Sequence, residues 1–114
     1  MSVFENALKN VVTNAYFCQH VSDNTFVSRS FRDTEKNLEK LEYTPVGVCF
    51  EPSYRGALGP ALVFQDKNGN TGWVHLGQSI MIEWLTELNM MPPDNIVWDW
   101  KVIKEHVWGE KMYE

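Results

Sequence analysis

Apolar side chains near the start of the chain recur at three- and four-residue intervals. The stripe consists of Phe4, Ala7, Leu8, Val11, Val12 and Ala15. Such spacing places side chains on one face of a helix and predicts a helix over residues 3–17 that packs against a core. Ser2 and Glu5 match the capping-box pattern, which supports a helix start at this point.

Two further segments are predicted to be helical. Residues 78–91 carry a stripe of Met81, Trp84, Leu85 and Leu88, and the Pro92-Pro93 pair ends the pattern. Residues 33–43 read DTEKNLEKLEY, in which Asp33 is placed to cap a short helix. Its charged residues are typical of a solvated face.

Alternating or β-branched segments predict strands at residues 25–31, 45–51, 61–65, 71–76 and 96–103. The third and fourth of these flank Asn68-Gly69, a pair that provides the positive φ angles of a tight hairpin. Residues 52–60 contain two Pro and two Gly and are predicted to be a loop.

Together these elements predict an α+β fold in a single domain over residues 1–114. We expect a small antiparallel sheet of about five strands. An N-terminal helix and one or two further helices are expected to pack on one face of that sheet.

The charge balance and the cysteine content restrict the class of protein. The net charge is −5, the pI is about 5.1, and no run of five like charges occurs. Duplex nucleic-acid binding normally requires a basic patch, so this class is disfavoured. The N-terminus lacks the basic and apolar regions of a secretory signal, and no stretch is apolar enough to span a membrane. We therefore expect a cytoplasmic protein in which Cys18 and Cys49 are free thiols.

Catalytic and metal-binding motifs are not found in the sequence. The three histidines, His20, His75 and His106, are far apart, and no known nucleophile, phosphate-loop or zinc motif surrounds them. Cys18-x-His20 supplies two metal ligands but needs distant partners. We expect a protein that is not an enzyme and has neither a cofactor nor a bound metal.

Aromatic residues beside polar ones are the stronger candidates for ligand binding, because a nucleobase stacks on Trp, Tyr or Phe. Arg29 precedes Phe31, and Arg55 follows Tyr54, although such pairs are commonly surface stacks. Asp94 and Asn95 follow the Pro-Pro pair and are suited to bind ribose or a base edge. The alternative for these two residues is ordinary turn chemistry.

The segment DNIVWDWKV (94–102) contains Trp98 and Trp100, two residues apart. In a strand they would lie on one face, and that face would be covered by the chain's own helix, by a second copy or by a ligand.

This segment resembles the closing signature D-x-x-x-x-D-W-x-V of a small phage and bacterial domain family. Some members of that family are Thoeris anti-defence proteins of the nucleotide-sponge type. FENALKNV (4–11) is similar to the opening helix of the family, and DKNGNTGWV (66–74) is similar to its hairpin. The chain differs from the family pattern by the additional helix predicted before Asp94.

The resemblance implies a homo-oligomer that sequesters a cyclic nucleotide-derived immune signal and does not cleave it. The family's site residues can be carried over to three positions of this chain only, namely Trp73, Asp94 and Trp100. With the aromatic and polar candidates, the predicted ligand site comprises Trp73, Asp94, Asn95, Trp98, Trp100, Arg29 and Arg55. The alternative function is an acidic protein-interaction module that inhibits or adapts a host protein through exposed tryptophans.

Overall fold

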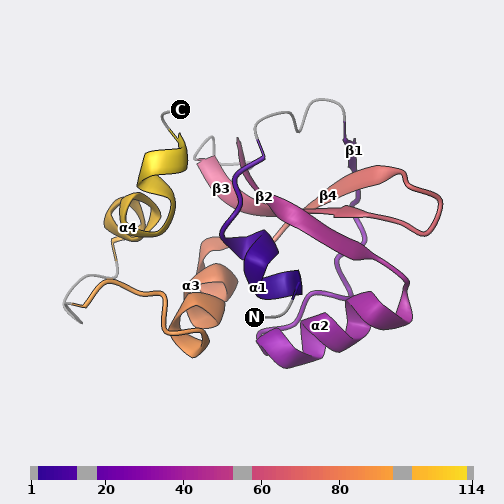
Figure 1. Cartoon of the computed structure of the whole chain (residues 1–114), viewed down its shortest axis with the longest axis horizontal. Coiled ribbons are helices and arrows are strands. Elements are labelled where there is room, and N and C mark those ends of the chain that lie inside the picture. Colours follow the sequence, from indigo (N-terminus) through magenta and orange to yellow (C-terminus); the bar gives the residue numbers. More distant parts are fainter. Residues whose placement is uncertain (1–2, 13–17, 53–57, 94–98, 113–114) are drawn as a thin grey trace.

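The computed structural model describes residues 3–12, 18–52, 58–93 and 99–112 (Figure 1). Its helices are α1 (Val3–Leu8), α2 (Phe31–Lys40), α3 (Gln78–Glu87) and α4 (Trp100–Met112). Its strands are β1 (Gln19–His20), β2 (Thr44–Pro52), β3 (Leu58–Gln65) and β4 (Thr71–His75). The α+β class predicted from the sequence is confirmed.

The described strands form one sheet in the order β1-β4-β3-β2. The β2–β3 and β3–β4 pairs are antiparallel, whereas β1 pairs with β4 in parallel. The sheet therefore has four described strands and is mixed, where about five antiparallel strands were expected. The predicted strands at residues 45–51, 61–65 and 71–76 are confirmed as β2, β3 and β4.

The β3–β4 hairpin is held by the turn that the sequence predicted. Gly69 has a φ of 85°, in the left-handed region that glycine tolerates. The Asp66 carboxylate accepts hydrogen bonds from the backbone N–H groups of Asn68 (2.9 Å) and Asn70 (3.0 Å). This arrangement fixes the turn, and with it the register that places Trp73 opposite Val63.

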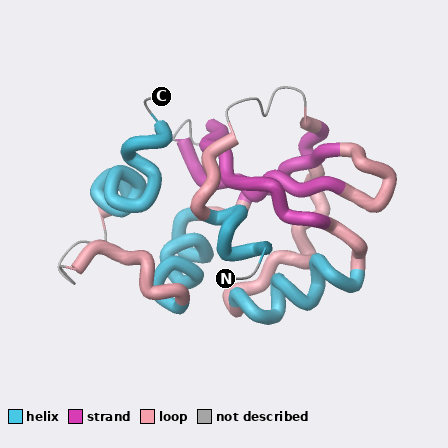
Figure 2. Tube along the Cα trace, in the orientation of Figure 1, coloured by secondary structure: helices cyan, strands magenta, loops and turns pink. Residues whose placement is uncertain are grey.

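The two faces of the sheet have different surroundings. The inner face packs against helices α1 to α4 and contributes Val48, Phe50, Leu62, Phe64 and Val74 to the main core. Figure 2 shows α1, α2 and α3 gathered on this side. The outer face carries the buried residues Cys49, Ala61 and Val63, against which Trp73 packs. No described helix residue belongs to this second cluster.

Three aromatic rings join the first three helices on the inner side. Phe4 of α1 stacks on Phe31 of α2, with ring centroids 4.8 Å apart. Trp84 of α3 meets Phe4 edge-on at 5.4 Å and Phe31 at 6.5 Å. Each of these side chains is at most 5% exposed, so this cluster is the point at which the helices are fixed to one another.

The N-terminal helix is shorter than predicted. It ends at Leu8, and the chain then runs alongside β2. The backbone N–H of Val12 donates to the carbonyl of Val48 (2.9 Å), and the N–H of Val48 donates to the carbonyl of Asn10 (2.8 Å). β-Branched Val11 and Val12 suit this extended pairing better than a helix, so tertiary contacts override the helical spacing here.

The strand predicted at residues 25–31 is wrong. This segment is a turn followed by the start of α2, whose N-cap is Ser30 and not Asp33. The Ser30 hydroxyl accepts a hydrogen bond from the N–H of Asp33 at 3.3 Å. Buried Thr34 accepts from the N–H of Ser28 (2.9 Å), which anchors the turn to the helix.

The strand predicted at residues 96–103 is also corrected, because α4 begins at Trp100. The carboxylate of Asp99 accepts a hydrogen bond from the N–H of Lys101 (3.0 Å), and the Asp99 carbonyl accepts from the N–H of Ile103 (3.1 Å). Asp99 is therefore a helix cap. Residues 94–98, and most of the predicted 52–60 loop, lie outside the described residues.

Helix α2 ends with a non-glycine residue in the left-handed region. Glu42 has a φ of 59°, and the N–H of Tyr43 donates to the carbonyl of Leu38 (2.9 Å), which is the Schellman pattern. We expect Glu42→Gly to raise the free energy of unfolding by about 0.5–1 kcal/mol, since glycine adopts this φ without strain. Urea denaturation measures the change.

The matched control for this substitution lies at the end of α3. Asn89 has a φ of 57° in an equivalent position. Asparagine tolerates this conformation, so Asn89→Gly should stabilise less than Glu42→Gly. A loss of stability in the Glu42→Gly variant would contradict the strain argument.

Candidate functional site

An aromatic cluster lies on the outer face of the sheet, where strands β1 and β4 meet. The ring centroids of His20 and Trp73 are 4.4 Å apart, and those of Trp73 and His75 are 4.9 Å apart. The two imidazole rings are 5.8 Å from each other. His20 is exposed, whereas Trp73 and His75 are half-buried. We call these three residues the His-Trp-His cluster.

The sheet register explains why these side chains meet. Trp73 and His75 are two residues apart on β4 and share a face. Parallel pairing sets His20 of β1 opposite Trp73, and the N–H of Val21 donates to the Trp73 carbonyl at 2.9 Å. Gly72 permits this approach, because a Cβ there would lie 3.2 Å from the Val21 side chain and 3.3 Å from the Gln19 carbonyl.

Two thiols and one carboxylate lie near this cluster. Burial, with a contribution from Glu51, raises the pKa of the Cys49 thiol to about 12. Burial and Glu51 also raise the pKa of Cys18. Both thiols are therefore uncharged at neutral pH, which argues against a nucleophilic role. Among the described residues, no group of three His, Cys, Asp or Glu side chains is placed to hold a metal ion.

The environment of His75 makes stability depend on pH. Burial lowers the pKa of His75 below 6.5, the neighbouring His20 lowers it further, and Glu51 opposes the shift. Below pH 6.5 the unfolded chain binds a proton at this residue before the folded chain does. Stability contributed by neutral His75 is therefore present above pH 6.5 and is lost as the pH falls through 6.5 toward the folded-state pKa.

We expect the free energy of unfolding to decrease between pH 7.5 and pH 5, and His75→Gln to make this dependence shallower. Urea denaturation at a series of pH values measures the slope. Val102→Ala on α4 is the control, because it removes an exposed side chain that does not titrate, and it should leave the slope unchanged. If His75→Gln retains the full slope, His75 is not the cause of the pH dependence.

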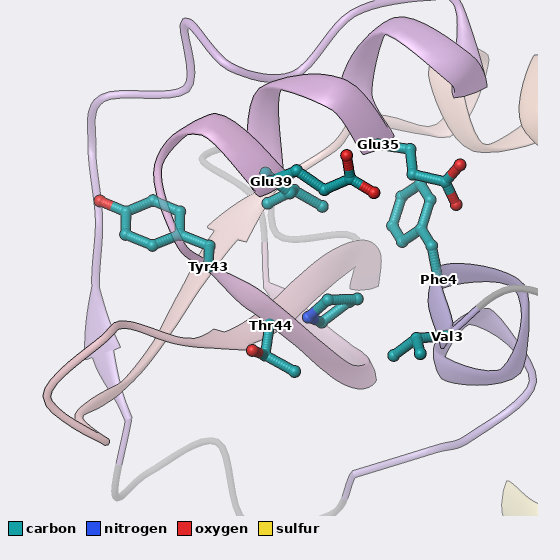
Figure 3. Close-up of a pocket in the computed structure, with 8 residues that line it drawn as sticks. Val3, Phe4, Glu35, Glu39, Tyr43 and Thr44 are labelled. Carbon is teal, nitrogen blue, oxygen red and sulfur yellow. The ribbon is translucent and has the colours of Figure 1, made fainter.

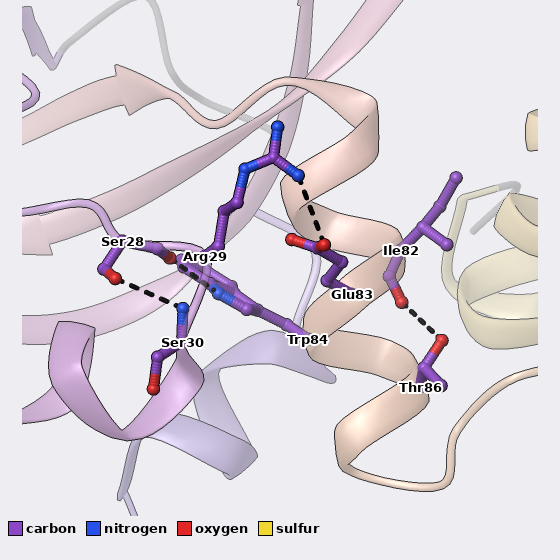
Figure 4. A network of polar contacts seen from close by, with 7 residues as sticks. All are labelled: Ser28, Arg29, Ser30, Ile82, Glu83, Trp84 and Thr86. Atoms are coloured by element: carbon purple, nitrogen blue, oxygen red, sulfur yellow. Dashed lines mark hydrogen bonds and ion pairs between the residues drawn. The ribbon is translucent and has the colours of Figure 1, made fainter.

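The structure separates the three predicted site residues that it describes. Trp73 belongs to the His-Trp-His cluster, and Trp100 packs against the core of the inner face. Arg29 is exposed and pairs with Glu83 of α3 at 3.2 Å (Figure 4). Arg29 therefore takes part in a surface ion pair beside Trp84. Trp73, Trp100 and Arg29 do not form one site. Asp94, Asn95, Trp98 and Arg55 lie outside the described residues.

Trp100 is a structural residue in this arrangement. Its ring lies 6.3 Å from Phe50 and 6.0 Å from Trp108, measured between centroids. Its Nε1 atom is buried and donates to no acceptor in the described part of the chain. Because α4 begins at this residue, Trp100 does not lie in the predicted strand. The predicted alignment of Trp98 with Trp100 falls on a residue outside the described part of the chain.

Sequence reasoning missed the two histidines of the cluster. The signal for His75 was present, because it follows Trp73 by two residues in a predicted strand. His20 gave no such signal, since it lies in the two-residue strand β1, in a segment for which no element was predicted. Only the parallel pairing with β4 brings His20 to the site.

Comparisons with protein-family models, with curated proteins and with solved structures found no match for this chain. The helices described by the structure include none with both the length and the apolar character needed to cross a membrane.

Proposed function

We propose that this chain is a non-catalytic binding protein that sequesters a small nucleotide-like molecule on the outer face of its sheet. The His-Trp-His cluster is the observation that carries the proposal. Its rings come from two adjacent strands, so the backbone of the sheet holds them in place. The binding mode is stacking of a planar base on the exposed side of the cluster, with truncation of one stacking ring costing about 1–3 kcal/mol.

The two imidazoles supply the second part of the recognition. A protonated imidazole donates hydrogen bonds from both ring nitrogens and attracts a phosphate. The lowered pKa of His75 keeps this ring neutral at pH 7 without ligand. Binding of an anion would favour the protonated ring, so affinity should increase as the pH falls from 8 to 6.

The proposed biological role of this protein is to sequester a nucleotide-derived signal. A protein that holds a nucleotide-derived signal without cleaving it lowers the free concentration of that signal. The resemblance in residues 94–102 supports a defence signal as the ligand, and supports a phage or bacterial protein that works in the host cytoplasm as a homo-oligomer.

Isothermal titration against cyclic dinucleotides and cyclic ADP-ribose isomers tests the proposal, and chromatography of the recovered ligand tests for turnover. We expect one ligand to bind and to be recovered intact. His20→Ala should weaken its binding by about 5- to 100-fold, and Trp73→Ala by at least as much. Because His20 is exposed, its removal leaves the fold intact, whereas Trp73→Ala also removes packing on Val63.

His106→Ala is the control on α4 and should bind like the parent. Light scattering of the same samples reports whether the chain is an oligomer. Heat-silent titrations across the whole panel, or binding that His20→Ala and Trp73→Ala leave unchanged, would overturn the proposal. Recovery of a converted product would replace it with an enzyme function.

The alternative of a protein-interaction module through exposed tryptophans receives less support. Of the four described tryptophans, Trp84 is 0% and Trp108 is 1% exposed. Trp73 and Trp100 are half-buried. The described surface therefore lacks the cluster of exposed tryptophans that such an interface would use as its centre.

A further inference from the structure

A concave site lies on the side of the sheet opposite the His-Trp-His cluster, between α1, α2 and the start of β2. This open pocket has a volume of about 310 Å³, at the lower end of the range for small-molecule sites. Its apolar lining comes from Val3 and Phe4 of α1, Leu38 of α2 and Pro45 of β2. Figure 3 shows the side chains of Val3 and Phe4 facing this space from α1.

The apolar walls are held in place by aromatic packing. Phe4 stacks on Phe31 at 4.8 Å, and Tyr43, which also lines the pocket, stacks on Phe64 at 4.7 Å. Phe4 and Leu38 are each 2% exposed, so they form a fixed floor. Val3 is 64% exposed and leaves one wall open to solvent. The pocket is thus preformed, which lowers the cost of binding a ligand.

Two carboxylates stand over this floor. Glu35 and Glu39 are one turn apart on α2, and Figure 3 shows both side chains reaching from the helix on the side of Phe4. In the described part of the chain neither carboxylate forms an ion pair. Like charges four residues apart on a helix repel each other, and a cation placed between them relieves that repulsion.

We propose that this pocket binds a small organic cation, with its ammonium or guanidinium group between Glu35 and Glu39 and its apolar body on Phe4 and Leu38. The apolar lining favours an organic body over a bare ion, and two carboxylates alone do not complete the oxygen shell of a metal ion. The same carboxylates repel nucleotides, so this site is separate from the His-Trp-His cluster and does not depend on the function proposed for that cluster.

The probe is phenethylammonium, which combines one ring with one ammonium group. Titration followed by methyl and amide NMR should show saturable shifts at Val3 and Leu38, with a Kd of about 1 mM for a ligand of this size. The neutral isostere 2-phenylethanol should bind about tenfold more weakly, and 3-phenylpropionate should not bind. Equal binding of the amine and the alcohol would show that the carboxylates do not recognise charge.

The double variant E35Q/E39Q should bind phenethylammonium about tenfold more weakly than the parent. The control E51Q/E83Q removes two charges from β2 and α3, away from the pocket, and should bind like the parent. Val3→Lys should also weaken binding, because it places a competing cation at the open wall. All these positions are exposed or half-buried, so the variants remain folded. Unchanged affinity in both E35Q/E39Q and Val3→Lys would overturn the proposal.

Discussion

Trp84→Ala is expected to lower the free energy of unfolding by about 3–5 kcal/mol. The indole is 0% exposed and packs edge-on against both Phe4 of α1 and Phe31 of α2. Removing it opens a cavity at the point where three helices meet. Because a domain of this size is stable by about 5–15 kcal/mol, the loss is a large part of the total.

The Trp84→Phe variant distinguishes the stability contributed by the packing of the ring from that contributed by its hydrogen bond. The Trp84 Nε1 donates to the carbonyl of Ser28 at 3.0 Å (Figure 4). That carbonyl also accepts from the Thr34 hydroxyl at 3.1 Å, so it keeps a partner in the Phe variant. We therefore expect Trp84→Phe to cost less than half as much as Trp84→Ala. Urea denaturation measures both, and Glu83→Gln on the exposed side of α3 is the control, within about 0.5 kcal/mol of the parent.

Trp108→Ala is also expected to lower the free energy of unfolding by about 3–5 kcal/mol, through the loss of different contacts. Trp108 is 1% exposed, and its Nε1 donates to the carbonyl of Leu8 at 2.6 Å. Its ring also meets Phe50 at 5.3 Å. This one side chain joins α4 to the end of α1 and to β2, so its loss removes packing and leaves a buried carbonyl without its donor.

Hydrogen exchange locates the effect of Trp108→Ala. Ile103 and Trp108 are the large buried side chains of α4 in the described region, so amides of α4 should lose protection more than those of β3. Val102→Ala is the control on the same helix, because Val102 is 43% exposed. Equal protection of α4 in the parent and in Trp108→Ala would show that other contacts hold the helix.

The sheet could be predicted from the sequence wherever local signals agreed with one another. Strands β2, β3 and β4 combine β-branched residues with the Asn68-Gly69 turn, and the structure confirms all three. The 99–103 segment shows why agreement is needed. Trp100 and Val102 fit the alternation of a strand, whereas Trp100 and Ile103, which are three residues apart, fit the spacing of a helix. The cap at Asp99 favours the helix.

Long-range pairing explains what the sequence could not predict. Val11 and Val12 are β-branched and suit an extended segment, but nothing in residues 10–12 indicates that they pair with Val48. The same holds for His20, whose position depends on a two-residue parallel strand. The candidate site was predicted only at Trp73. Its partner His20 arrives from a distant part of the chain through backbone hydrogen bonds that have no local sequence pattern, whereas His75 lies two residues away on the same strand.

The N-terminal segment reaches both margins of the β2–β3–β4 meander. Val11 pairs with β2, and Gln19 and His20 pair with β4. An open strand margin is a template for pairing with another molecule and thus for aggregation. These contacts join residues far apart in the sequence, so they form after the local hairpins during folding. Pairing of the N-terminal segment therefore also protects both margins of the sheet from self-association.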